Sequence, residues 1–208
     1  MNVSNNLRSR TFIAVPLLLL TSFTGCKSFR PVEDLNRFYV LSASTKASTE
    51  ARANQSLTIG VAPVDLPGYL QSTRIAIRRG TNEIYYPENR QWAEHLDKGI
   101  QWVLASDLSS QLPSARVITS AWQPGDVKSE VHVAIRRFEL DESGLATLEC
   151  EWRIVSPDNS SVLHLDHALI TKKGPPLSTN PADAVSTLSQ ALGELSNQIA
   201  AALKTSGG

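Results

Sequence analysis

The sequence has no excess of charge of either sign: its 208 residues contain 20 Lys plus Arg and 20 Asp plus Glu. A nucleic-acid-binding protein is therefore not expected, because neutralising phosphates requires a surplus of basic side chains. The 11 glycines are scattered and no heptad pattern is sustained, which excludes collagen-like and coiled-coil proteins. With 41% hydrophobic residues, a chain of this length predicts one folded domain.

Cysteine is also scarce. The two cysteines, Cys26 and Cys150, are too few for a disulfide framework. Cys150 alternates with Leu148 and Trp152 on one face of an expected strand. This position predicts a buried, unreactive thiol.

Residues that could carry catalysis or bind a metal are equally sparse. The four histidines cluster only in His164-Leu165-Asp166-His167, where a strand would place His164 and Asp166 on one face and His167 on the other. Such side chains do not converge on one ion. Neither a G-x-S-x-G nucleophile motif nor a glycine-rich phosphate loop occurs. We therefore predict no catalytic residue, no metal site and no cofactor, and an enzyme is not expected.

The first residues are typical of an export signal. Arg8 and Arg10 precede the apolar run Phe12–Leu20, which is shorter than the roughly 20 residues that a spanning helix needs. The segment Thr24-Gly25-Cys26 then resembles the processing site of bacterial lipoproteins, in which the cysteine is acylated and becomes the first mature residue. We predict a lipoprotein signal peptide over residues 1–25.

We predict that a lipid is covalently attached to Cys26. The polar residues after it form a tether, so that residues 26–37 are the lipidated N-terminus and tether. Acyl chains would hold the exported protein to a bilayer, since each buried methylene contributes about 0.8 kcal/mol. Cleavage before Cys26 removes Arg8 and Arg10 and leaves two more acidic than basic side chains. Lys27 rather than aspartate follows the cysteine, and in the sorting rule of Gram-negative bacteria this favours the outer membrane. We expect the protein on the periplasmic face of that membrane.

The remaining chain has the periodicities of a mixed α/β protein. Alternation and turn residues predict strands at residues 38–41, 57–64, 73–79, 83–86, 116–119, 130–140, 145–155 and 162–170. Apolar stripes predict helices from near Gln91 to Leu112 and from Pro181 onward, with Trp92 in the core, and a surface loop is expected at residues 42–56. We predict a single domain over residues 38–205: a mixed β-sheet, an antiparallel meander on its C-terminal side, and two long amphipathic helices packed on the sheet.

The turn expected at residues 65–70, after the strand at residues 57–64, has more apolar residues than a solvated turn needs. Such groups often mark a contact surface, although the leucines could also fold back onto the sheet, an alternative stronger for Leu70 than for Tyr69. The basic residues that follow could bind a partner or acidic lipid headgroups, or form a solvated face. The candidate partner-binding residues are Leu66, Pro67, Tyr69, Leu70, Arg74 and Arg78.

Several short motifs occur in a particular order. The first is Phe38-Tyr39-Val40-Leu41, and the strand Ile59-Gly60-Val61-Ala62-Pro63-Val64 leads to Leu66-Pro67-Gly68-Tyr69-Leu70. After Glu83-Ile84-Tyr85-Tyr86 comes Gln91-Trp92-Ala93-Glu94-His95-Leu96. This order, behind a lipidated cysteine, resembles the ABC-type transport auxiliary lipoprotein family over nearly the whole mature chain.

The resemblance implies a non-catalytic periplasmic component of an envelope transport system that contributes to membrane integrity. Such lipoproteins act as adaptors for inner-membrane ABC transporters or for MCE-domain proteins, which carry phospholipids and other hydrophobic molecules between the two membranes. Homo-oligomerisation is implied by the same analogy. Two alternatives stay open: a carrier domain that shelters a lipid between sheet and helix and, more distantly, an envelope hydrolase.

Overall fold

The computed structural model describes residues 35–44, 57–123, 125–158 and 160–206. The predicted signal peptide, Cys26 and most of the predicted tether lie outside these residues, as does most of the loop expected at residues 42–56. Leu35 is the first described residue of the domain. Within the described ranges, no helix is both long and apolar enough to cross a membrane.

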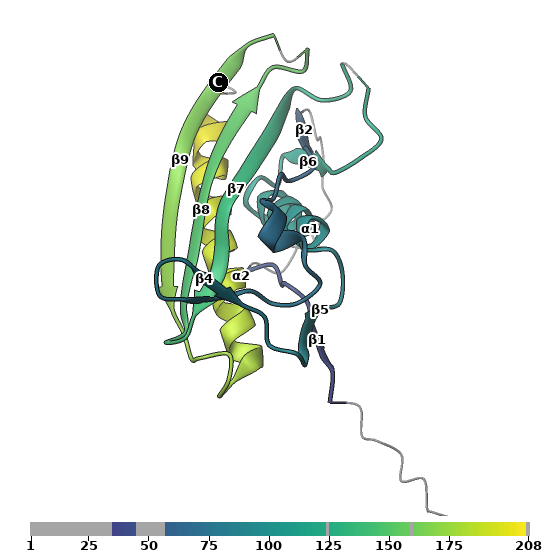
Figure 1. The fold of residues 1–208 in the computed structure, drawn as a ribbon. Helices are drawn as coiled ribbons and strands as arrows, with labels where there is room; N and C mark the ends of the chain where they lie inside the picture. The colour runs from purple at the N-terminus through teal and green to yellow at the C-terminus, as the bar shows by residue number, and fades with distance from the viewer. Residues whose placement is uncertain (1–34, 45–56, 124, 159, 207–208) are drawn as a thin grey trace, which may run out of the picture. The chain divides into compact units, whose positions relative to one another are not determined.

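Short strands make up most of the first part of the domain, and three long strands follow later in the chain (Figure 1). One helix lies between β5 and β6, and a second helix follows the last strand. The elements in chain order are β1 (Arg37–Tyr39), β2 (Leu57–Val61), the 3-10 turn η1 (Gly68–Gln71), β3 (Ile77–Arg79), β4 (Glu83–Tyr85), β5 (Arg90–Trp92), α1 (Leu96–Gln111), β6 (Ala115–Ile118), β7 (Ser129–Asp141), β8 (Leu145–Val155), β9 (Val162–Lys173) and α2 (Pro181–Ser206). The prediction of a single domain with a mixed sheet and two helices is confirmed.

The strand β7 is shared by two groups of strands. Its first residues pair in parallel with β2, with Ile59 opposite Ser129, and β2 pairs in turn with β6. Its last residues pair in parallel with β3, with Ile77 opposite Leu140, and β3 forms the expected antiparallel hairpin with β4. Between β2 and β3 the chain stays beside β7, because the Asp65 backbone bonds to β7 both as donor and as acceptor.

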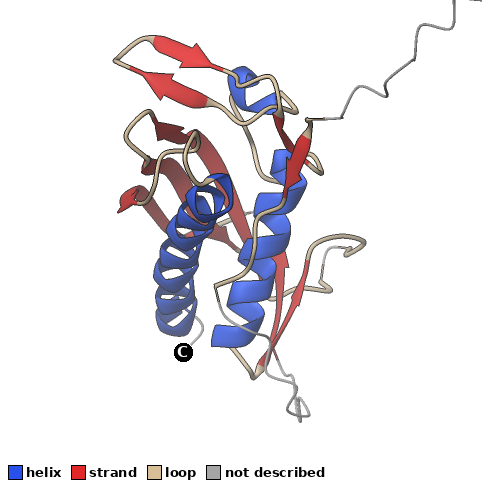
Figure 2. Ribbon diagram, turned by 90° about the horizontal axis from the view of Figure 1, so that it is seen from below, coloured by secondary structure: helices blue, strands red, loops and turns tan. Residues whose placement is uncertain are grey.

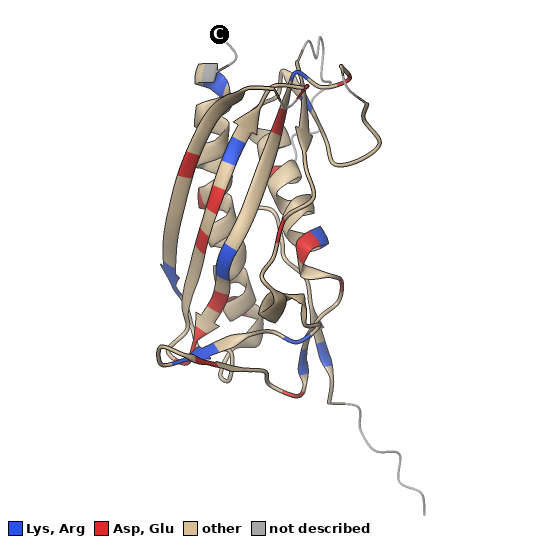
Figure 3. Ribbon diagram, turned by 45° about the horizontal axis from the view of Figure 1, so that its top comes forward, with Lys and Arg blue, Asp and Glu red and all other residues tan. Residues whose placement is uncertain are grey.

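On its other side β7 pairs with β8, and β8 pairs with β9, in both cases antiparallel. The side chains of β8 alternate: Cys150 and Trp152 are buried, while Glu149 and Glu151 are part-exposed and Arg153 is exposed. Glu149, Glu151 and Arg153 therefore lie on the outer face of the sheet. Figure 3 shows charged residues at intervals along β7, β8 and β9. The inner face is therefore the one available for packing helices.

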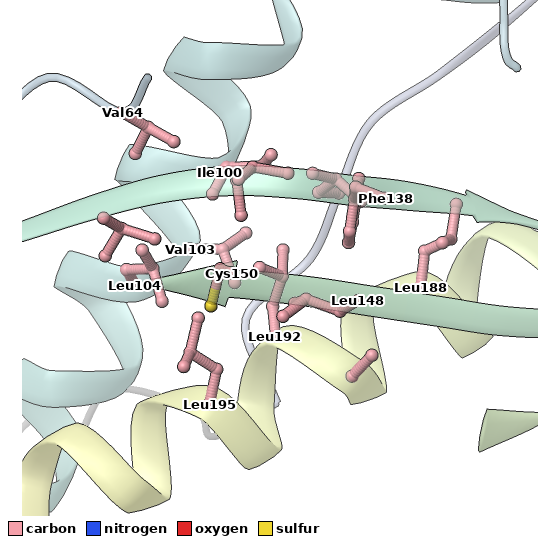
Figure 4. Close-up of a cluster of buried hydrophobic side chains, with 14 of the residues drawn as sticks. Val64, Ile100, Val103, Leu104, Phe138, Leu148, Cys150, Leu188, Leu192 and Leu195 are labelled. Carbon is pink, nitrogen blue, oxygen red and sulfur yellow. The ribbon is translucent and has the colours of Figure 1, made fainter. Parts of the chain in front are cut away.

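Both helices lie on this inner face. The helix α2 contacts β7, β8, β9 and α1, and α1 also contacts β2 and β6 (Figure 2). Figure 4 shows side chains from the two helices meeting those of β7 and β8, including Leu104, Phe138, Leu148 and Leu192, which are at most 1% exposed. Burying each such side chain contributes about 1.5–3 kcal/mol, so this layer is the main source of stability.

Two buried polar side chains tie the helices to the rest of the domain. Gln101 of α1 donates to the carbonyl of Val61 at 2.8 Å and to that of Thr119 at 3.1 Å. Asp107, also on α1, accepts from the Ser44 backbone N–H at 2.9 Å and from the Ser196 hydroxyl of α2 at 3.4 Å. Because buried polar groups need partners, these bonds restrict how the helices can pack.

The predicted helix start at Gln91 is wrong. Residues Arg90–Trp92 form β5, which pairs in parallel with β1 to make a small two-stranded unit, the β1–β5 ribbon (Arg37–Tyr39 with Arg90–Trp92). The Trp92 N–H donates to the Thr73 carbonyl at 2.7 Å, and α1 begins only at Leu96. The four-residue spacing of Trp92 and Leu96 fits a helix, but pairing with distant segments decides the conformation. Trp92 is buried, as predicted.

The closing helix was predicted from its first residues, and that start is confirmed. The Asp183 N–H donates to the Asn180 side-chain carbonyl at 3.3 Å, which is an N-cap bond, and Pro181 occupies the first helical position. The strand predicted at residues 57–64 is shorter than expected, because β2 ends at Val61. Pro63, which has no N–H to donate, follows two residues later.

A glycine substitution tests the turn between β7 and β8. Gly144 has a φ of 88°, and a Cβ atom at this position would overlap the backbone of Gly174 and Pro175. We expect Gly144→Ala to lower the free energy of unfolding by about 2–4 kcal/mol, because the left-handed conformation and the overlap both destabilise the alanine. Urea unfolding monitored by tryptophan fluorescence measures the change.

The matched control for this prediction is Gly80→Ala in the β3–β4 hairpin. Gly80 also has a positive φ, 58°, but a Cβ there would have no atom within 4 Å. This variant should lose only about 1 kcal/mol from the backbone conformation. Equal losses in the two variants would contradict the close approach of Gly144 to the segment before α2.

Candidate functional site

The turn predicted as a contact surface is only partly exposed. Leu66 and Leu70 have 9% and 3% of their surfaces exposed and belong to the main hydrophobic cluster. The hypothesis that these two leucines contact a partner is corrected: they anchor the turn, because the chain between β2 and β3 stays against β7. Pro67 and Tyr69 remain partly exposed.

Tyr69 belongs to a buried polar cluster centred on Glu139 of β7, which is only 1% exposed. The Oε1 atom of Glu139 accepts from Arg78 Nε at 2.6 Å and from Arg137 Nε at 3.0 Å. The Oε2 atom of Glu139 accepts from the Tyr69 hydroxyl at 2.6 Å and from the Phe138 backbone N–H at 3.1 Å. All the donors a buried carboxylate requires are thus supplied from η1, β3 and β7.

This cluster shifts the ionisation of its members. Burial raises the pKa of Tyr69, and the hydrogen bond and the negative charge of Glu139 raise it further. The hydrogen bond to Glu139 likewise raises the pKa of Arg78. Tyr69 is therefore a neutral hydroxyl and Arg78 a cation at any physiological pH. Both predicted contact residues are engaged inside the domain, where they hold the turn and the hairpin to the sheet.

Arg74 is placed differently. It is exposed, and its guanidinium carbon lies 5.6 Å from the ring centroid of Tyr86. Tyr86 in turn donates its hydroxyl proton to the Tyr69 carbonyl at 2.8 Å. A similar pair lies next to it, with Arg79 positioned 5.0 Å from the ring centroid of Tyr85. These stacked pairs give the hairpin an aromatic and basic surface.

This surface lines an open cleft of about 780 Å³. The hairpin, the segment before β5, the β7–β8 turn and the loop before α2 all contribute to it. Three basic residues (Arg74, Arg79 and Arg90), three acidic residues (Glu88, Asp141 and Glu142) and apolar surface from Tyr86 and Leu177 line it. The cleft therefore combines charges of both signs with aromatic surface, an arrangement that suits recognition of a polar group.

Of the six candidate contact residues, only Arg74 lines this cleft; Arg78 lies on the opposite face of β3. The sequence did not predict that Tyr85, Tyr86, Arg90 and Leu177 belong to one site. The adjacent tyrosines behind a basic strand were the available signal. No sequence signal marked Leu177, because tertiary packing of the loop before α2 is what brings it to the cleft.

The residues considered for chemistry lie where the strand pattern predicted. His164 stacks on Trp152 with ring centroids 4.8 Å apart, whereas His167 lies on the other face, 3.9 Å from Glu151. Over the described ranges, no group of three or more His, Cys, Asp or Glu residues could hold a metal ion. Cys150 is 2% exposed, and burial raises its pKa to about 12.

With this geometry known, the chain can be compared with known proteins. The sequence model that describes the ABC-type transport auxiliary lipoprotein component matches residues 39–200. The chain belongs to that family. The match begins at Tyr39, the last residue of β1, and includes β5, the cleft, the Glu139 cluster and most of α2.

Two curated relatives are similar to this chain in sequence. The chain is 26% identical over 130 residues to the intermembrane transport lipoprotein PqiC of Escherichia coli K12 and of Shigella flexneri. These alignments cover 62% of this chain and 66% of each relative.

Solved structures support the fold. A crystal structure of an uncharacterized protein has a TM-score of 0.67 at 20% identity, covering 80% of this chain and 97% of that one. A protein of Xanthomonas campestris has a TM-score of 0.64 at 18% identity, covering 82% and 96%. At these identities the likeness shows that the fold is shared.

The Glu139 cluster makes a prediction about stability. Glu139→Gln removes the charge that neutralises Arg78 and Arg137, so the free energy of unfolding should fall by about 3 kcal/mol. Glu142→Gln is the matched control, because the Arg79–Glu142 ion pair is exposed and should matter far less. Urea unfolding of both variants measures the difference. Similar losses in the two variants would contradict a structural role for the buried cluster.

Cys150 makes a prediction about reactivity. With a pKa of about 12, only about one thiol in a thousand is ionised near pH 9, whereas an unfolded cysteine is largely thiolate there. In a Cys26→Ala protein, iodoacetamide should therefore alkylate Cys150 at least about a thousandfold more slowly in the folded than in the unfolded state.

The raised pKa of Cys150 also makes the stability of the fold depend on pH. A raised folded-state pKa stabilises the fold below about pH 9, and that contribution is lost as the pH rises towards 12.

The control for the alkylation experiment is a cysteine placed at the exposed position of Trp102, which should react freely in the folded protein. Equal alkylation rates at positions 102 and 150 would contradict the burial of the thiol.

Proposed function

We propose that this protein is an outer-membrane lipoprotein, anchored through acylated Cys26 and facing the periplasm, that serves as a non-catalytic component of an ABC- or MCE-type lipid transport system. Membership of the auxiliary lipoprotein family is the observation that carries this proposal. The names of the curated relatives, which are intermembrane transport lipoproteins, support it. The role would be that of an adaptor that contributes to membrane integrity.

The packing of the domain favours an adaptor over a carrier. A carrier would hold its lipid between the sheet and the helices, yet side chains such as Phe138, Leu148 and Leu192 pack against one another there. The open cleft lies outside this layer and is lined by several charged groups. Its apolar side chains are interspersed with these charged groups, and an acyl chain bound there would desolvate them without pairing them.

The outer strand β9 supports a protein contact. Within the described residues it pairs only with β8, so its other edge is free along twelve residues. Its outer face exposes Leu165 and Leu169, which are 54% and 69% accessible. Long, apolar edge strands are usually covered by another chain, because they otherwise promote aggregation. The expected partner is an MCE-domain protein, an ABC transporter subunit or a second copy of this chain.

Photo-crosslinking in cells tests the adaptor. A photoreactive amino acid at Leu165 should form a crosslink to an MCE-domain or ABC-transporter protein, identified by mass spectrometry. The same probe at Ala201, exposed on α2, is the matched control and should give far less of that product. A crosslink of Leu165 to a second copy of the chain would add homo-oligomerisation to the adaptor role.

The Cys26→Ala form of each probe protein separates the adaptor from the carrier. The adaptor requires the anchor, so the partner crosslink should weaken when the protein becomes soluble in the periplasm. Crosslinks to lipid alone, retained in the soluble form, would contradict the adaptor and support the carrier.

A further inference from the structure

The β1–β5 ribbon exposes apolar side chains at the start of the described chain. Leu35, Phe38 and Val40 have 57%, 60% and 56% of their surfaces exposed. Their neighbours differ: Tyr39 packs against the core and Leu41 is only 5% exposed. Because strand side chains alternate, one face of this segment packs on the domain and the other directs Phe38 and Val40 outward.

Basic side chains lie on the other face of the ribbon. Arg37 and Arg90 are register partners and, by the same alternation, share the face of Tyr39 and Trp92, opposite Phe38 and Val40; Arg74 is bridged to Gln91 next to them. Figure 3 shows the basic residues on both strands of the ribbon. Among the described residues none of the three arginines has an ion-pair partner, although Glu88 lies in the adjoining cleft.

The position of the ribbon along the chain limits its distance from the anchor. Leu35 follows Cys26 by nine positions. Even a fully extended chain of that length spans at most about 32 Å. If Cys26 is acylated, the ribbon contains the described strand that is separated from the anchor by the fewest residues.

We infer that the β1–β5 ribbon is a second, non-covalent membrane contact. Phe38 and Val40 enter the interfacial region of an anionic phospholipid bilayer, and Arg37 and Arg90, on the opposite face of the ribbon, bind the lipid phosphates that lie above the apolar region. The inference rests on the proposed acylation of Cys26. A bilayer is favoured over a protein here because the anchor itself brings the membrane within reach, and because apolar side chains on one face with arginines that form no ion pair on the other suit a membrane interface.

This contact would orient the domain. The end of β8, the start of β9 and the last turn of α2 lie at the end of the domain opposite the ribbon (Figure 1). With the ribbon on the membrane, the long strands β7, β8 and β9 extend away from the bilayer. The free edge of β9 then faces the periplasm, where a partner can reach it.

Fluorescence quenching by lipid tests the contact. The full acylated protein carries an environment-sensitive fluorophore on a cysteine at Gln91, opposite Phe38 in the ribbon. It is reconstituted in vesicles of equal parts phosphatidylethanolamine and phosphatidylglycerol that contain brominated lipid. We expect quenching several-fold stronger than for the same label at Trp102, which is exposed on α1. Equal quenching at the two positions would overturn the inference.

Three double variants, one of them a control, test which side chains are responsible. Phe38→Ser with Val40→Ser should reduce the quenching at position 91 to the level at position 102, while Leu165→Ser with Leu169→Ser, equally exposed on β9, should leave it unchanged. Arg37→Gln with Arg90→Gln should remove the dependence on phosphatidylglycerol that the parent shows when that lipid is replaced by phosphatidylcholine. Circular dichroism checks that each variant is folded. Quenching that neither the Phe38 and Val40 substitutions nor the Arg37 and Arg90 substitutions change would contradict the assigned contact.

Mass spectrometry of the purified protein separates this inference from the proposed function. Absence of acyl chains on Cys26 would overturn the anchor and, with it, the basis of the inference. An acylated protein whose Gln91 label is not quenched would overturn the ribbon contact alone. If the Phe38 and Val40 substitutions instead abolish a protein crosslink in cells, the ribbon binds a protein and the bilayer contact is wrong.

Discussion

The architecture depends on one constraint, the sharing of the long strand β7 by strands on both of its edges. On one edge β2 occupies its beginning and β3 its end, so the chain between them must run alongside β7 and turn at η1. Leu66 and Leu70 are buried because of this path. On the other edge β8 and β9 extend the sheet, and α2 covers the inner face that results.

Glu139 lies where the β3 end of β7 meets η1. A buried carboxylate is unfavourable unless it is paired, and here two arginines, a tyrosine hydroxyl and a backbone N–H satisfy it. The polar cluster therefore specifies how the turn and the hairpin meet the sheet, while the hydrophobic layer under α1 and α2 provides most of the stability. With the interior occupied in this way, the surfaces left for function are the cleft, the edge of β9 and the β1–β5 ribbon.

Much of the fold could be predicted because its signals are local. The alternation of Leu148, Cys150 and Trp152 and the Asn180–Pro181 helix start need only neighbouring residues to be recognised. The prediction failed at Gln91, where the spacing of Trp92 and Leu96 fits a helix equally well. Hydrogen bonds to β1 and to Thr73, which no local pattern reveals, select the strand.

The candidate site was less predictable for the same reason. Tyr69 and Arg78 were recognised as residue types suited to a contact, yet whether they face solvent depends on Glu139, some 60 to 70 positions away. The motifs in sequence order were sufficient to identify the family, and local periodicity was sufficient to predict most of the strands and both helices, whereas lipid attachment at Cys26 stays a prediction. Only the tertiary structure decided which side chains are buried, which arginines are paired and which strands have a free edge, because these properties arise from contacts between distant segments and not from local periodicity.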